Sequence, residues 1–131
     1  MAEIQITYTA VDASNYVAVF RQFNETIVPR GYLPGESFQI SATGSTILSG
    51  APVRRRYLWT LAVTMPKADA VSVMDLFEAW DADRASGKTC AVDIVDSTFG
   101  STVTSKAIFS TPPVFDNVRS GILVSMGLTE V

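Results

Sequence analysis

Few residue types in this 131-residue chain can do acid–base or nucleophilic chemistry, because histidine is absent. Histidine is the most frequent general base near neutral pH and the most frequent metal ligand in proteins. A serine or cysteine nucleophile needs an adjacent base, and without histidine only the rarer lysine or carboxylate arrangements remain. The sequence therefore argues against an enzyme and predicts no catalytic residue.

Two carboxylate pairs remain as candidates for catalysis or metal binding. Asp93 and Asp96 are close in the chain, as are Asp81 and Asp83. Such pairs serve in glycoside hydrolysis and in the binding of divalent cations. Their surroundings favour structural roles, because Asp93 alternates with apolar residues as on the polar face of a strand, Asp96 suits a turn, and Asp81 and Asp83 lie near the end of a predicted helix. We expect no metal and no cofactor.

The single cysteine, Cys90, excludes an internal disulfide and any zinc site built from several cysteines. It begins a predicted strand, where we interpret it as a small packing residue. No glycine-rich phosphate loop with a following lysine and hydroxyl residue is present, and the segment 31–35 contains a proline where a cradle needs N–H groups. Nucleotide binding is not expected.

The net charge of −3 argues against a dedicated nucleic-acid surface, which normally needs a basic field. The one basic run is 54–56, for which three interpretations stand: a solvated strand end, a contact with an acidic protein, or a contact with nucleic acid. Alternation of sides along a strand keeps this run from forming one patch unless the backbone bends. No stretch has the roughly 18 apolar residues of a membrane span, and residues 1–10 lack a signal-peptide pattern. We expect a chain made in the cytoplasm that is neither exported nor membrane-bound.

Strand-like alternation of apolar and polar residues recurs along most of the chain. The strongest segment is 57–64, rich in aromatic and β-branched residues. A glycine turn at 42–45 predicts a hairpin between 38–42 and 46–48. Pro112 and Pro113 are expected to end the strand that begins at Val103. The other predicted strands are 4–10, 17–20, 90–95 and 122–128.

One helix is predicted, over about 67–86. Pro66 suits its first turn, Asp69 complements its N-terminus, and Gly87 is the expected left-handed residue after its end. The spacing i, i+3, i+4, i+7 assigns its apolar face. That face consists of Ala70, Val73, Met74, Phe77 and Trp80.

The segment 20–37 is predicted to be an irregular loop, because two prolines and two glycines interrupt any strand pairing there. Long irregular loops in small domains are often functional. Phe23 and Tyr32 have no period that turns them inward, so they either form a protein interface or fold back over the core. The predicted interface residues are Phe20, Phe23, Ile27, Arg30, Tyr32, Leu33, Arg54 and Arg55.

These elements predict a single domain over 1–131 that is mainly β with one α-helix. An antiparallel β-sandwich or open barrel, with the amphipathic helix packed on it, fits runs of strands around one helix. The aromatic residues Trp59, Phe77 and Trp80 lie on periodic apolar faces, which favours the core over a carbohydrate platform.

The order of features from Arg56 to Val131 resembles minor tail and distal-tail-type proteins of tailed bacteriophages. The similarity is carried by the strand at 56–63, the helical segment 76–80, a glycine and a strand ending in Asp96, and the closing segment 122–131 with its late acidic residue. The resemblance implies a non-catalytic structural subunit of the tail tip or baseplate, located in the virion. Its partners would be other tail subunits, and it would join the tail tube to the hub as a homo-oligomeric ring. The chain lacks the second, carbohydrate-binding-like domain of larger distal-tail proteins, which speaks against a direct receptor role.

Two other classes of function remain open. One is a small-molecule or carbohydrate-binding β-sandwich with its pocket near Tyr32 and Trp59. The other is an enzyme that uses Asp93 and Asp96.

Overall fold

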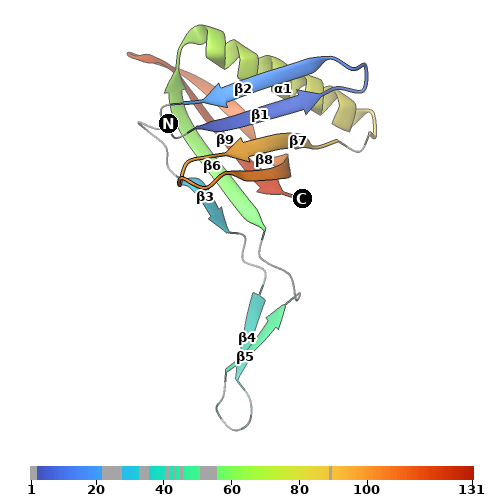
Figure 1. The fold of residues 1–131 in the computed structure, drawn as a ribbon, viewed down its shortest axis with the longest axis vertical. Coiled ribbons are helices and arrows are strands. Elements are labelled where there is room, and N and C mark those ends of the chain that lie inside the picture. The colour runs from blue at the N-terminus through green and yellow to red at the C-terminus, as the bar shows by residue number, and fades with distance from the viewer. Residues whose placement is uncertain are drawn as a thin grey trace.

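A computed structural model describes residues 3–21, 28–32, 36–40, 42, 44, 46–50, 56–88 and 90–131. Nine strands and one helix follow each other along these parts of the chain (Figure 1). The elements are β1 (Ile4–Thr9), β2 (Asn15–Phe20), β3 (Val28–Tyr32), β4 (Glu36–Ile40), β5 (Thr46–Gly50), β6 (Tyr57–Met65), α1 (Lys67–Ala85), β7 (Val92–Asp96), β8 (Val103–Val118) and β9 (Gly121–Glu130). The predicted class, mainly β with a single helix, is confirmed for the described residues.

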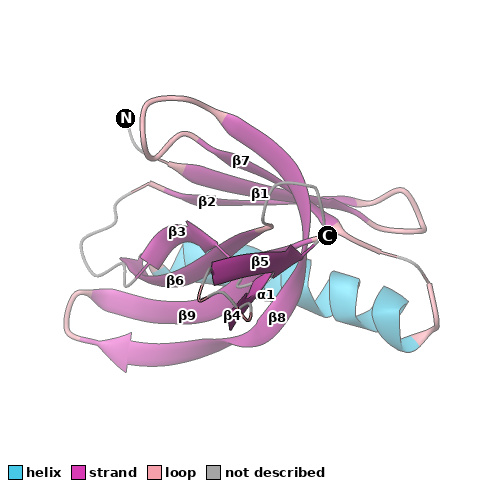
Figure 2. Cartoon of the chain, turned by 90° about the horizontal axis from the view of Figure 1, so that it is seen from below, coloured by secondary structure: helices cyan, strands magenta, loops and turns pink. Residues whose placement is uncertain are grey.

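Seven strands form one antiparallel sheet in the order β2-β1-β7-β8-β9-β6-β3. The sheet curves strongly, so that β1, β2 and β7 lie across from β6, β8 and β9 (Figure 2). β2 and β3 are its two edges. The apolar core fills the concave side, where the sheet meets α1.

Alternation along the strands explains which side chains fill the core, because every second residue of a strand faces the same side. Ile4, Ile6 and Tyr8 are buried on β1, as predicted from their spacing. On β9 the buried series Val124, Met126 and Leu128 also follows the predicted period. Trp59, Leu61, Val63 and Met65 complete this side from β6.

The ends of helix α1 agree with the sequence. Pro66 precedes its first turn in an extended conformation, and Gly87 follows its end with φ of +79°. The N–H groups of Gly87 and Lys88 donate to the carbonyls of Arg84 and Asp83, which is the Schellman pattern of a glycine-terminated helix. Among the described residues, no helix combines the length and apolar character needed to cross a bilayer.

The buried face of α1 differs from the predicted one by one position. Leu76 is buried together with Ala70, Val73 and Trp80, whereas Met74 is 38% exposed. The prediction for Met74 is wrong because α1 packs mainly against β2. This packing buries the residues spaced i, i+3, i+6 and i+10 along the helix. Phe77 lies at the margin of the core, edge-on to Phe109 at 5.1 Å between ring centroids.

The expected end of a strand at Pro112 and Pro113 is wrong, since β8 continues through both prolines to Val118. β7 pairs with β8 only from Val103 to Ala107. Beyond that point β8 pairs with β9 alone, and its register shifts on both sides of Thr111. A proline is tolerated where a strand has a free side or a bulge, because no partner then needs its missing N–H.

The segment expected to be irregular, 20–37, contains part of the main sheet. Phe20 ends β2, and β3 pairs with β6 through a register shift between Val28 and Gly31. Pro29 is accommodated for the same reason as in β8, because β3 is an edge strand.

The predicted hairpin is confirmed as β4 and β5, whose five residue pairs run from Glu36–Gly50 to Ile40–Thr46. It forms a two-stranded sheet of its own. The hairpin projects from the end of the molecule opposite α1 (Figure 1). We call β4 and β5 the arm.

Candidate assembly surfaces

The arm leaves the main sheet between β3 and β6. Tyr32, the last residue of β3, is paired with Tyr57, the first residue of β6. The two strands that carry the arm are thus held side by side at its root. The position of the arm root therefore depends on what holds β3 to the rest of the sheet.

A buried ion pair fixes β3 at this point. Nη1 of Arg30 lies 3.5 Å from Oδ2 of Asp96, and the exposed fractions of the two side chains are 13% and 0%. Asp96 also accepts hydrogen bonds from Nε1 of Trp59 at 3.0 Å and from the backbone N–H of Thr98 at 2.9 Å. A buried carboxylate is tolerated only when such donors and a cation replace its water. Asp96 therefore joins β3, β6 and the turn after β7.

Aromatic rings cover the Arg30 guanidinium on two sides. Its Cζ lies 5.2 Å from the ring centroid of Tyr57 and 4.9 Å from that of Phe99. The rings of Tyr32 and Tyr57 follow at 5.5 Å between centroids. Tyr32 and Phe99 are both more than half exposed. The root of the arm thus presents an aromatic surface around a largely buried arginine, a composition enriched at protein interfaces.

A second buried carboxylate, Glu130, ties the C-terminal strand to the same region. It accepts a hydrogen bond from the backbone N–H of Tyr57 at 3.0 Å and another from the hydroxyl of Ser105. Glu130 thereby connects β9 to β6 and β8 close to the arm root. The late acidic residue of the sequence thus has a structural role.

The structure places the predicted interface residues in different environments. Phe20 is buried in the core, so that part of the prediction is wrong: Phe20 follows the inward alternation of β2. Arg30 is engaged with Asp96, and Tyr32 is the one of the three that offers a largely exposed side chain. The remaining predicted residues lie outside the described part of the chain: Phe23, Ile27, Leu33, Arg54 and Arg55.

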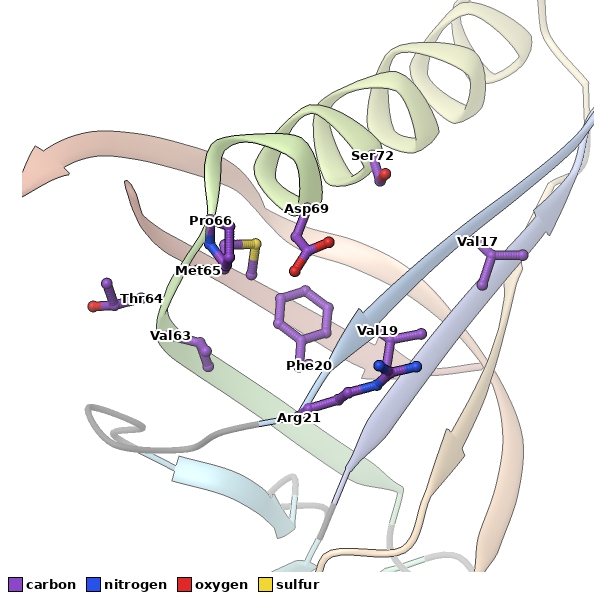
Figure 3. A pocket seen from close by; sticks show the side chains of 10 residues that line it. All are labelled: Val17, Val19, Phe20, Arg21, Val63, Thr64, Met65, Pro66, Asp69 and Ser72. Carbon is purple, nitrogen blue, oxygen red and sulfur yellow. The ribbon is translucent and has the colours of Figure 1, made fainter. Parts of the chain in front are cut away.

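A second surface feature is a pocket of about 340 Å³ beside the edge strand β2. Val17, Val19 and Arg21 border it from β2 and the residue after it, and Asp69 and Ser72 border it from the first turns of α1 (Figure 3). The end of β6 forms its floor around Met65. We call this site the edge groove.

The carboxylates considered for catalysis do not assemble into one site. Asp93 is half exposed and pairs with Lys106 at 2.9 Å, while Asp96 is buried in the contacts described above. Asp81 pairs with Arg84 on the surface of α1. Among the described residues, no group of three or more histidine, cysteine, aspartate or glutamate side chains is placed to hold a metal ion.

Asp83 has a structural contact with strand β1. It accepts hydrogen bonds from the phenol of Tyr8 and from the backbone N–H of Val11 at 3.2 Å. Burial and the Asp83 carboxylate raise the pKa of the Tyr8 phenol above its usual range. Burial, together with the same carboxylate, raises the pKa of the Cys90 thiol, whose Sγ lies 3.8 Å from the carbonyl oxygen of Trp80. A raised pKa is the opposite of what a reactive thiol needs.

The carbohydrate alternative placed a pocket near Tyr32 and Trp59. Trp59 is fully buried and its indole N–H is committed to Asp96, so its ring has no free face for a sugar. The pocket of the edge groove lies elsewhere, next to β2 and α1.

The structural roles of Phe99, Asp96 and Glu130 at these surfaces were not predicted from the sequence. Phe99 lies in a turn, outside any alternating series of residues. Its contact with the Arg30 guanidinium is evident only in the folded structure. Asp96 was interpreted as a turn residue and Glu130 as the late acidic residue of the closing segment, yet both continue the inward-facing alternation of their strands. That alternation was the available signal for their burial.

No protein-family model matches the chain, and no curated protein matches it significantly in sequence.

Proposed function

We propose that this chain is a structural subunit of a bacteriophage tail tip or baseplate, which links the tail tube to the hub through contacts with neighbouring subunits. The projecting arm is the observation that carries the proposal. The resemblance of residues 56–131 to minor tail and distal-tail-type proteins supplies the setting. In this proposal the chain is made in the host cytoplasm and incorporated into the virion as a homo-oligomeric ring.

The physical argument starts from the arm as an isolated sheet. A two-stranded hairpin is marginally stable in water, and it needs a third strand or a packing surface to be secure. Among the described residues, β4 and β5 pair with each other and form a two-stranded sheet of their own. Another subunit can supply the missing packing surface, as in peptide recognition by strand addition.

The arm root supports the same proposal. The Arg30–Asp96 pair connects β3 to the end of β7 beside the root of the arm. Tyr32 and Phe99 offer exposed aromatic surface beside it. Rigid aromatic residues around a desolvated arginine are typical of the residues that dominate binding energy in interfaces.

Excision of the arm tests the proposal. Because Tyr32 and Tyr57 are paired, residues 33–56 can be replaced by a two-residue Asn-Gly turn that suits an antiparallel hairpin. The shortened chain should keep its circular dichroism and its cooperative unfolding but stay monomeric in light scattering, whereas the full chain assembles. Assembly of a folded, arm-less chain equal to that of the full chain would refute the proposal.

A further inference from the structure

We draw no further inference here: the strongest candidate, the edge groove between β2 and the first turns of α1, has only the exposed side chains of Arg21 and Asp69 as its charged groups, and nothing in the described part of the chain shows what occupies it.

Discussion

At the scale of single residues, the ion pair of Arg30 and Asp96 is the contact with the largest expected effect on stability. Removing one partner of a buried pair leaves the other charge without compensation, which costs about 3–5 kcal/mol. Asp96→Asn should therefore lower the free energy of unfolding by about 3 kcal/mol, measured by urea denaturation with tryptophan fluorescence.

Asp93→Asn is the matched control, because Asp93 lies on the same strand but forms an exposed pair with Lys106. Exposed pairs contribute little, so a loss below about 1 kcal/mol is expected. Equal losses from the two variants would show that Asp96 does not act through burial.

The Tyr8 phenol makes the stability of the folded chain depend on pH. An unfolded tyrosine titrates near pH 10, and the folded chain raises the pKa of this phenol by burial and by the Asp83 carboxylate. The folded state therefore binds the proton more tightly. Its contribution to stability is complete below about pH 10 and is lost as the pH rises from there towards the folded pKa.

Tyr8→Phe should remove the hydrogen bond to Asp83 and cost about 2 kcal/mol at pH 7. It should also flatten the alkaline loss of stability, which thermal unfolding between pH 7 and 11 measures. The raised pKa of Cys90 gives a loss of the same sign and depends in part on the Tyr8 phenol. Both chains therefore carry Cys90→Ala, and the difference between their curves then isolates the phenol. Parallel curves for both chains would contradict the assignment.

At the scale of elements, helix α1 distinguishes the observed packing from the predicted one. Leu76 is 1% exposed and should cost about 2–5 kcal/mol when changed to alanine, because the change leaves a cavity. Met74→Ala should cost less than about 1 kcal/mol, since Met74 faces outwards. Chemical denaturation of both variants measures the two losses of stability. A larger loss for Met74→Ala than for Leu76→Ala would support the buried face predicted from spacing.

Periodicity predicted the elements well where one face of a strand is buried against the core. The strands around Trp59 and Val124, the hairpin of β4 and β5, and the glycine end of α1 follow from residue spacing and turn residues. The predictions that prolines would end strand pairing were wrong, because a proline interrupts a strand only where a neighbouring strand needs its N–H group. Pro29 and Pro113 lie in strand segments that pair on one side only, a fact of sheet topology that no local pattern contains.

The candidate surfaces were less accessible to sequence reasoning. Tyr32 was chosen as an interface candidate because it belongs to no alternating series of residues that would place it in the core. Arg30 was assigned to an interface, yet it pairs with Asp96 across 66 positions of sequence, and only the fold brings the two together. Phe20 was misplaced because it was counted with the loop that follows, although its alternation with Ala18 puts it on the buried face of β2. The edge groove combines β2, β6 and α1, and therefore depends on the order of strands in the sheet.

At the scale of the whole molecule, the chain has a curved sheet braced by one helix at one end and an arm that projects from the other (Figure 1). The proposed role in assembly uses the projecting arm and the aromatic surface at its root. A protein that associates through its arm should form particles of defined size.

Native mass spectrometry of the full chain over a range of concentrations tests the central claim most directly. A discrete multiple of the monomer mass, which becomes dominant as concentration rises, is the predicted result. A species that remains monomeric at every concentration would contradict it.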